Sequence, residues 1–396
     1  MRPLHGERQA FRYDYVLFAA VILLTLIGLV TLYSASYLFA LNQPGRFAGG
    51  GAPLFSNIVA CLIMIAVFPV LAFIKLDVFK KEWIIFGLVM FTIAINLLPL
   101  VPFFQKSNFE PGIDVRRWII IRRGGSDWLS FQPSEVIKLV LPLYLAYILD
   151  KNGEKLHKFF YGPFPPAVVT AIFCALVLWQ NNFSEVVMIA LVSIAVCFIA
   201  GIRFRWFGLA LLLCVPAIYS LITGDRGGRW YNRIYTFINP GQDVLGSRYQ
   251  IDMSLEAIRA GGFWGRGIGQ GTVKTRIPEV HGDFVFASYA EEFGLLGVFL
   301  HLAIIGVFAG IVFYVVWRSR DRFSQLLAFG LVTPIVMQTL LNVAVVANVV
   351  PTTGVALPFV SSGGSSLLMT LCASALLVNL ARRHALSLDE EERNVG

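Results

Sequence analysis

Asp283 is the residue of this sequence best placed to act as a general base. It stands where a polar, arginine-rich loop ends and a long apolar segment begins, within the stretch 278–286. A carboxylate at such a junction is partly desolvated, which raises its pKa toward the range of a useful base. A simpler interpretation is that Asp283 caps the helix that follows, because Asp is a preferred N-cap residue. The local sequence leaves both interpretations open.

Two polar loops, 104–132 and 224–283, carry thirteen lysine and arginine residues between them. Arginine side chains present paired donors that match the geometry of phosphate and pyrophosphate. These loops therefore favour an anionic substrate, and binding of anionic lipid headgroups is the alternative. The thirteen cations are Lys106, Arg116, Arg117, Arg122, Arg123, Arg226, Arg229, Arg233, Arg248, Arg259, Arg266, Lys274 and Arg276.

Glu135 and Lys138 form a second candidate pair, on the segment that follows Pro133. Their i, i+3 spacing places them on one helix face, where the two charges can pair. Ionisable groups inside a membrane are costly and by default indicate function. The alternative is a structural ion pair that locks this helix. Glu185, at the start of another apolar segment, is interpreted as interfacial and receives little functional weight.

Two segments rich in small residues offer backbone amides. In 261–269, Gly265, Gly267 and Gly269 would let N–H groups approach a phosphate, and a flexible turn is the alternative. No strand precedes this segment, so it does not match a dinucleotide-binding fingerprint. In 351–366, two prolines bracket a turn, and small residues including Ser365 then enter the last apolar segment. Such residues permit close helix packing or leave helix-end amides suited to an anion or sugar.

The composition predicts an all-α polytopic membrane protein. Hydrophobic residues make up 57% of the 396 residues and charged residues 14%, whereas soluble domains have roughly 25% charged residues. The first apolar run, 15–41, is longer than a signal-peptide core and is expected to be a retained span. The five cysteines lie in apolar runs, and Cys and His show no metal-ligand spacing. We expect about ten spans, near 15–40, 55–75, 83–103, 133–149, 165–181, 184–201, 206–223, 284–317, 324–349 and 357–381.

The charge pattern predicts the orientation of these spans. An even number of spans puts both termini on one side, and the segments on that side carry seventeen basic residues, which indicates the cytoplasm. The two basic loops then face outward, against the usual bias. The expected organisation is a cytoplasmic tail at 1–14, a membrane domain at 15–383 with its large extracytoplasmic loop at about 224–283, and a cytoplasmic tail at 384–396.

Taken together, the motifs resemble those of the SEDS family of peptidoglycan polymerases, the RodA/FtsW/SpoVE group. The resemblance covers residues 28 to 366, with the segments in family order. They are 28–36, Arg116-Arg117-Trp118-Ile119, Phe131-Gln132-Pro133-Ser134-Glu135 with Lys138, 233–234, 237–240, 249–250, 265–269, 278–284, 357–359 and 362–366. The sequence departs from the family pattern at 181–185, in the longer loop at 119–131 and at Gly282, just before Asp283.

The resemblance implies a membrane glycosyltransferase that joins lipid II units and releases undecaprenyl pyrophosphate. It implies that Asp283 is the essential acidic residue, that Glu135 and Lys138 are the family's buried pair, and that Arg117 and Trp118 belong to a sensitive extracytoplasmic motif. A class B penicillin-binding protein transpeptidase and other division or elongation proteins are the implied partners. The implied location is the bacterial inner membrane, and no nucleic acid is involved. The opening segment 29–36 favours the FtsW side of the family.

Glycosyl transfer needs a base for the acceptor hydroxyl and positive charge for the departing pyrophosphate. We expect an inverting mechanism with Asp283 as the base and with Glu135 and Lys138 organising the cavity. A divalent cation, Mg²⁺ or Mn²⁺, is a candidate cofactor with Asp283 as its candidate ligand, and no organic cofactor is expected. The candidate substrate-binding residues, besides Trp118 and the buried pair, are Arg116, Arg117, Arg233, Arg266, His281 and Ser365.

Two other classes of function remain as alternatives. A lipid II flippase would fit ten spans and intramembrane charges, since transporters use both. The outward-facing basic loops and the lack of an internal repeat in the sequence favour the polymerase instead. A non-enzymatic scaffold of the division or elongation machinery would explain the spans and tails but not Asp283 and its surroundings.

Overall fold

The computed structural model describes residues 12–42, 53–101, 117–123, 126–209, 212, 228–239, 247–277 and 280–395. Within these ranges it leaves out the side chains of 37–42, 53, 120–129, 228–232, 247 and 387–395. The main helices are α1 (Tyr13–Asn42), α2 (Pro53–Phe73), α3 (Glu82–Leu97), α4 (Ser134–Lys151), α5 (Phe164–Trp179), α6 (Phe183–Ile199), α8 (Gly228–Ile238), α9 (Ser247–Gly261), α10 (Val285–Arg318), α11 (Arg322–Val346) and α12 (Gly364–Val395). Short 3-10 turns are η1 (Leu76–Lys80), η2 (Leu98–Leu100), η4 (Gly153–Lys155) and η6 (Val273–Arg276).

The long helices follow the apolar runs of the sequence. In the described part of the chain, six helices are long and apolar enough to cross a membrane, namely α1, α2, α3, α10, α11 and α12. The apolar helices α5 and α6 are shorter, and α4 has 18 residues but carries charges. Nine of the ten expected spans thus correspond to helices among the described residues. The expected span at 206–223 lies largely outside those residues.

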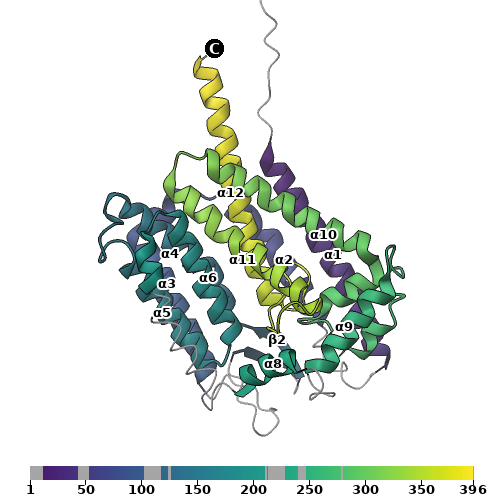
Figure 1. The fold of residues 1–396 in the computed structure, drawn as a ribbon. Helices are drawn as coiled ribbons and strands as arrows, with labels where there is room; N and C mark the ends of the chain where they lie inside the picture. The colour runs from purple at the N-terminus through teal and green to yellow at the C-terminus, as the bar shows by residue number, and fades with distance from the viewer. Residues whose placement is uncertain are drawn as a thin grey trace, which may run out of the picture.

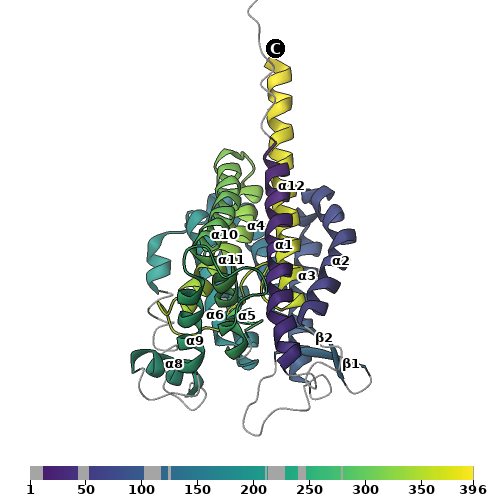
Figure 2. The same ribbon diagram turned by 90° about the vertical axis from the view of Figure 1, so that its right-hand side faces the viewer.

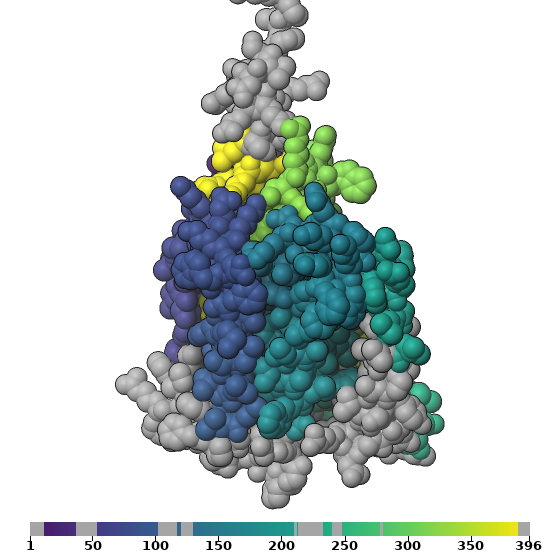
Figure 3. All heavy atoms as spheres, turned by 90° about the vertical axis from the view of Figure 1, so that its left-hand side faces the viewer, coloured from purple at the N-terminus to yellow at the C-terminus, as the bar shows by residue number. Residues whose placement is uncertain are grey.

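Figures 1 and 2 show the helices as one bundle with two distinct ends. The start of α1 and the far end of α12 lie at the upper end in Figure 1, whereas α8, α9 and the strands lie at the lower end. Helix α12 packs along α2 and α1, and α11 packs between α4, α6 and α10. Figure 3 shows one outer face of the bundle, on which blue and teal segments that include α3 and α5 stand side by side.

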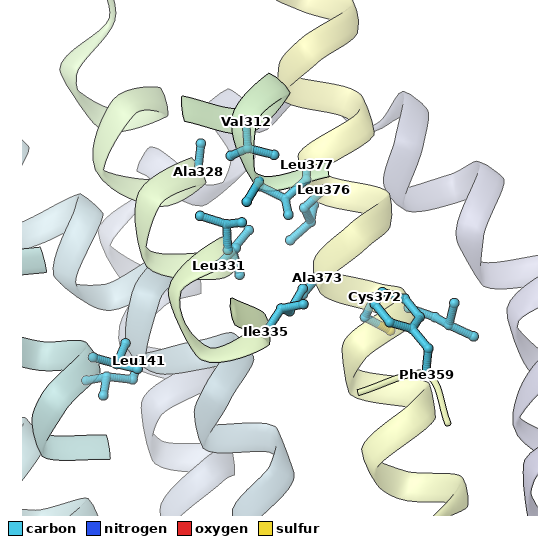
Figure 4. Close-up of a cluster of buried hydrophobic side chains, with 14 of the residues drawn as sticks. Leu141, Val312, Ala328, Leu331, Ile335, Phe359, Cys372, Ala373, Leu376 and Leu377 are labelled. Atoms are coloured by element: carbon cyan, nitrogen blue, oxygen red, sulfur yellow. The ribbon is translucent and has the colours of Figure 1, made fainter. Parts of the chain in front are cut away.

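The core of the bundle lies where α10, α11 and α12 meet, as Figure 4 shows. Because lipid is as apolar as these side chains, their association depends on close packing rather than on exclusion of water. Gly330 of α11 illustrates this, since a Cβ atom there would lie 2.9 Å from Cβ of Pro142 in α4. The labelled residues in the figure are Leu141, Val312, Ala328, Leu331, Ile335, Phe359, Cys372, Ala373, Leu376 and Leu377.

The last helix begins later than expected. The sequence predicted a span from 357, but α12 starts at Gly364, and the preceding segment forms a turn in which Phe359 has a positive φ of 66°. This turn packs tightly on α1, because a Cβ atom at Gly28 would lie 2.1 Å from the carbonyl oxygen of Phe359. The consequence is a non-helical segment that reaches into the bundle beside Asp283.

Helix α10 is interrupted at Gly294, which has φ 65° and ψ −169°. Such a conformation suits glycine alone. The amides of Leu295 and Leu296 beyond the break donate to the carbonyl groups of Gly262 and Phe263, at 2.9 and 3.1 Å. The segment after α9 is therefore anchored directly on the interruption in α10.

One element was not expected. Strands β1 (Ile119–Arg123) and β2 (Ser126–Phe131) form an antiparallel pair, with an irregularity between Ile121 and Arg122. The sequence analysis treated this segment as part of a long loop. Hairpin pairing satisfies its backbone groups without any partner element. The hairpin is short, so the fold remains helical in class. Strand β2 ends at Phe131, shortly before α4 begins at Ser134.

Candidate functional site

The turn that carries Asp283 is held by three successive backbone carbonyl groups. The carbonyl of His281 accepts from the amide of Ser362 at 2.8 Å, and that of Gly282 accepts from the hydroxyl of Ser361 at 2.9 Å. The carbonyl of Asp283 accepts from the side-chain amide of Asn342 at 2.8 Å. All three donors come from α11 or from the turn before α12. The backbone at Asp283 is therefore fixed from outside its own helix.

The carboxylate of Asp283 is not the cap of α10. The N-cap residue is Phe284, and the helix has no side-chain hydrogen bond at its cap. Asp283 is half-buried, and the next residue along the chain, Phe284, is buried. The capping interpretation of the sequence is therefore wrong, and the other interpretation, a partly desolvated carboxylate, agrees with the geometry.

Arg233 and Asp283 meet at Gly354. A Cβ atom built on Gly354 would lie 3.3 Å from Oδ2 of Asp283 and 3.7 Å from Nη1 of Arg233. Arg233, on α8, also donates from Nη1 to the carbonyl of Thr352 at 3.2 Å. The loop 350–356 thus lies between a carboxylate and a guanidinium that are fifty positions apart in the chain. Of the three candidate arginines that the structure describes, Arg117, Arg233 and Arg266, these distances place Arg233 beside Asp283.

The predicted pair of Glu135 and Lys138 is present and has a third member. Nζ of Lys138 lies 2.9 Å from both carboxylate oxygens of Glu135 and 3.4 Å from Oε1 of Glu185 on α6. All three side chains are almost fully buried. Glu185 is thus part of the charged cluster and not merely interfacial as the sequence analysis held. Its carboxylate inside an apolar run was the signal that indicated this role.

The charged cluster is connected to Asp283 through the loop 350–356. Ser184, next to Glu185 on α6, donates its hydroxyl to the carbonyl of Thr353. Thr353 is adjacent to Gly354, whose backbone lies against the Asp283 carboxylate. One short loop therefore contacts Ser184, the neighbour of the buried Glu185, and lies against the carboxylate of Asp283.

Ser365 joins two helices rather than facing Asp283 directly. It is buried in the first turn of α12, and its hydroxyl accepts from the amide of Gln132, just before α4, at 3.3 Å. Gly364 beside it packs on α2, because a Cβ atom there would lie 2.6 Å from the carbonyl oxygen of Ser56. The geometry of this segment agrees with the close-packing interpretation.

The glycine-rich loop does not form an open phosphate cradle. The carboxylate of Glu291 accepts from the amides of Thr272, Val273 and Lys274 at 2.7 to 2.9 Å, and Glu292 accepts from that of Gly269 at 3.0 Å. The amides of Gly265 and Gly267 donate to the backbone carbonyls of Gly261 and Glu292, at 2.9 and 3.0 Å. The three glycine amides thus already have internal acceptors and are not available to an external anion. The sequence analysis missed these two residues, although two adjacent glutamates inside an apolar segment were a visible signal.

Arg266 belongs to the same internal network. Its guanidinium donates to Oγ1 of Thr272 at 2.8 Å and to the carbonyl of Ala260 at 3.2 Å, and lies 3.8 Å from Oε1 of Glu291. Lys274, fully buried, is paired with Glu292 and donates to the hydroxyl of Ser34 on α1 at 2.7 Å. These contacts fasten the large loop to α1 and α10.

The remaining candidates lie near the hairpin or outside the described part. Arg117 and Trp118 are half-buried immediately before β1, whereas Arg116 lies outside the described residues. His281 is half-buried two residues before Asp283. Among the residues that the structure describes, no three His, Cys, Asp or Glu side chains gather closely enough to hold a metal ion.

Apolar helices arranged around buried charges, with a positioned carboxylate at one end, define a multi-pass membrane protein with a polar site. The chain belongs to the FtsW/RodA/SpoVE family, whose model, described as "Cell cycle protein", matches residues 14–386. The resemblance noted from the motifs and the predicted fold class are thereby confirmed.

Related proteins match along nearly their whole length. Proteins named "Probable peptidoglycan glycosyltransferase FtsW" from Geobacter metallireducens and Bacillus subtilis are 33% and 31% identical to the chain. The matches cover 94% and 93% of this chain and 95% and 90% of the relatives.

Two solved structures share the fold. A chain from a peptidoglycan synthase complex that coordinates polymerization and crosslinking has a TM-score of 0.74 and 24% identity. The rod shape determining protein RodA of Thermus thermophilus has a TM-score of 0.65 and 23% identity. The two comparisons cover 94% of this chain and 99% and 98% of the others.

Proposed function

We propose that the chain is a peptidoglycan glycosyltransferase that polymerises lipid II, with Asp283 as its general base. It is a membrane enzyme of the SEDS family and is FtsW-like. The observation that carries the proposal is the approach of the Asp283 carboxylate and the Arg233 guanidinium to the same backbone position, Gly354. A base and a cation side by side are what transfer from a sugar pyrophosphate requires.

The proposed reaction is a single inverting displacement. Asp283 takes the proton of the acceptor sugar hydroxyl as its oxygen attacks the anomeric carbon of the donor. The bond from that carbon to the pyrophosphate oxygen breaks, and the electron pair leaves with undecaprenyl pyrophosphate. Arg233 then neutralises charge that develops on the leaving group. Arg117 and Arg116 are further candidates for this contact, whereas Arg266 supports the loop through Glu291.

The buried charges of Glu135, Lys138 and Glu185 organise the cavity in this proposal. Their link to Gly354 through Ser184 and Thr353 supports a positioning role rather than a chemical one. A divalent cation, Mg²⁺ or Mn²⁺, remains a candidate cofactor that Asp283 would help to hold, and it would supply Lewis-acid stabilisation of the leaving group. His281 and Trp118 remain candidates for contacts with the sugar or the peptide.

The orientation in the membrane is part of the proposal. Both termini lie in the cytoplasm and the Asp283 end faces outward, because basic residues concentrate on the side of the termini. The start of α1 and the end of α12 do lie at the same end of the bundle, opposite the site (Figure 1). A class B penicillin-binding protein is the proposed partner, supported by the likeness to a chain of a peptidoglycan synthase complex. Other division proteins are further proposed partners.

The class of function is tested with purified protein and lipid II in detergent. A polymerase converts lipid II into glycan strands there, and the linkage formed has the opposite anomeric configuration to that of the donor. A flippase or a scaffold forms no strands, because detergent has no leaflets. The assay is run with the candidate transpeptidase present, and with and without Mg²⁺ or Mn²⁺. Folded protein that makes no strands in any of these conditions would contradict the proposal.

A further inference from the structure

A pocket lies at the far end of α10 from Asp283. It has a volume of about 420 Å³ and lies between the end of α10, the start of α11 and α12. The part of α10 beyond its interruption at Gly294, the 24 residues from Leu295 to Arg318, separates the pocket from the Asp283 end of the helix and is roughly 36 Å long at 1.5 Å per residue. Its lining residues are Val315, Val316, Arg318, Ser319, Arg320, Asp321, Ser324, Leu380, Arg383 and His384.

The pocket is strongly basic. Arg318, Arg320 and Arg383 line it from α10, from the turn after α10 and from α12. The one carboxylate in the lining, Asp321, already has its own cation, because Nζ of Lys80 lies 2.8 Å from its Oδ1. Its other oxygen accepts from the amide and hydroxyl of Ser324. Arg383 in turn lies 3.8 Å from Oδ2 of Asp77. The three arginines and Lys80 still outnumber the carboxylates of Asp321 and Asp77, so the net charge around the pocket is positive.

One wall of the pocket is apolar and continues the membrane-spanning surface. Val315, Val316 and Leu380 belong to helices long enough to span a membrane, within one or two turns of where those spans end. Trp317, next to Arg318, is 88% exposed. Exposed tryptophan at the end of a span is typical of the boundary between lipid and water. The pocket thus combines a cationic mouth with an apolar wall at that boundary.

We propose that this pocket binds the phosphate group of an anionic phospholipid. The guanidinium groups of Arg318 and Arg383 contact the phosphodiester, and the first part of an acyl chain lies along Val315 and Val316. Arginine matches the geometry of phosphate oxygens, and basic pockets between spanning helices suit anionic headgroups. Because the pocket is formed by three helices, a bound lipid holds the ends of α10, α11 and α12 together and stabilises the bundle.

The test measures lipid retention and thermal stability of the full-length protein in detergent. Dioleoyl phosphatidylglycerol, dioleoyl phosphatidylcholine and inorganic phosphate are titrated separately, and bound lipid is counted by native mass spectrometry. The test variant is the double substitution Arg318→Gln and Arg383→Gln. The matched control is Arg203→Gln with Arg205→Gln, two exposed arginines outside the pocket. Arg320→Gln, at an exposed position, serves as a milder second variant if the double variant folds poorly.

We expect phosphatidylglycerol to bind the wild type about tenfold more tightly than phosphatidylcholine. In the double variant, this ratio of the two affinities should be at least fivefold smaller. The Arg320→Gln variant should lose part of the preference for phosphatidylglycerol, and the control variant should retain the whole of it. Equal retention of phosphatidylglycerol by the wild type, the double variant and Arg320→Gln would overturn the proposal. An equal rise in melting temperature with inorganic phosphate alone would assign the site to a free anion and overturn the lipid assignment.

Discussion

The side-chain amide of Asn342 donates one hydrogen bond to the backbone carbonyl of Asp283 and another to that of Val355, each at 2.8 Å. Asn342 lies on α11 and is buried. One nitrogen atom therefore ties the turn of the proposed base to the loop that contacts Arg233. This arrangement makes Asn342 a positioning residue for Asp283.

Asn342→Asp keeps the size of the side chain and removes both donors. It places a carboxylate against two carbonyl oxygens, so the Asp283 turn and the loop 350–356 should move apart. Displacement of a catalytic group by about 1 Å can cost on the order of 100-fold in rate. We expect kcat for lipid II polymerisation to fall by about that factor and KM to change less. The control is Asn348→Asp, the same change six positions later, which should retain most activity. Equal kinetics for both variants would argue against the positioning role.

Gly354→Ala tests the close approach of the loop to Asp283. Gly354 has φ +74°, and its added Cβ atom would lie 3.3 Å from the Asp283 carboxylate. Gly201 has φ +85° with no atom within 4 Å of its Cβ position. Alanine should cost about 1 kcal/mol of backbone strain at each position. We therefore expect both variants to melt at similarly lowered temperatures, whereas polymerisation falls sharply only in Gly354→Ala. Polymerisation by Gly354→Ala at the wild-type rate would contradict the proposal that the close approach of Gly354 to the side chains of Asp283 and Arg233 matters for activity.

Removing each of the three buried charges, one at a time, should lower the stability of the protein by a different amount. Lys138→Met leaves two carboxylates buried without a cation, and breaking a buried pair in this way typically costs about 3–5 kcal/mol. Glu185→Gln leaves the pair of Glu135 and Lys138 intact and should be much milder. Glu135→Gln should be intermediate, because Lys138 keeps one partner, Glu185, at 3.4 Å. The order of melting temperatures in detergent checks this, and a Glu185→Gln protein less stable than Lys138→Met would contradict it.

Asp321 makes the far end of the bundle sensitive to acid. Burial raises the pKa of Asp321, but the hydrogen bonds from Lys80 and Ser324 outweigh it and bring the pKa below its ordinary value. A depressed folded-state pKa gives stability that is present above the unfolded-state pKa and lost as the pH falls through the folded-state value. The pair is exposed enough that its contribution is about 1 kcal/mol or less. Asp321→Asn should therefore lower the melting temperature slightly at pH 7, and this difference should shrink as the pH falls below the ordinary pKa of 3.8 toward the lower folded-state pKa. A constant difference across this range would contradict the assignment.

Local patterns allowed several features to be predicted from the sequence. Apolar runs identified the spanning helices, the i, i+3 spacing paired Glu135 with Lys138, and the polar-to-apolar junction located Asp283. What could not be predicted depends on contacts between distant segments. Glu185 meets Lys138 only because α4 and α6 pack side by side. Likewise, Arg233 could be chosen from the candidate arginines only once the position of the loop 350–356 was known, because Arg233 contacts that loop.

The glycine-rich loop shows a second limit of local patterns. Gly265, Gly267 and Gly269 do adopt positive φ values, as a phosphate cradle would require. Their amides nevertheless donate to internal acceptors, namely the backbone carbonyls of Gly261 and Glu292 and the Glu292 carboxylate. Spacing reveals backbone freedom, but it does not reveal which acceptor satisfies the amides.

The central claim is that Asp283 is the general base. The most direct test compares polymerisation of lipid II by the wild type, Asp283→Asn and Asp252→Asn, each with the candidate transpeptidase. Asp252 is a matched control, because it lies in the same large loop and forms a partly exposed pair with Arg248 on its own helix, α9. We predict that Asp283→Asn loses about 10²–10⁴-fold in rate, the usual contribution of a general base, while it melts like the wild type and Asp252→Asn stays active. Polymerisation by folded Asp283→Asn at the wild-type rate would contradict the account.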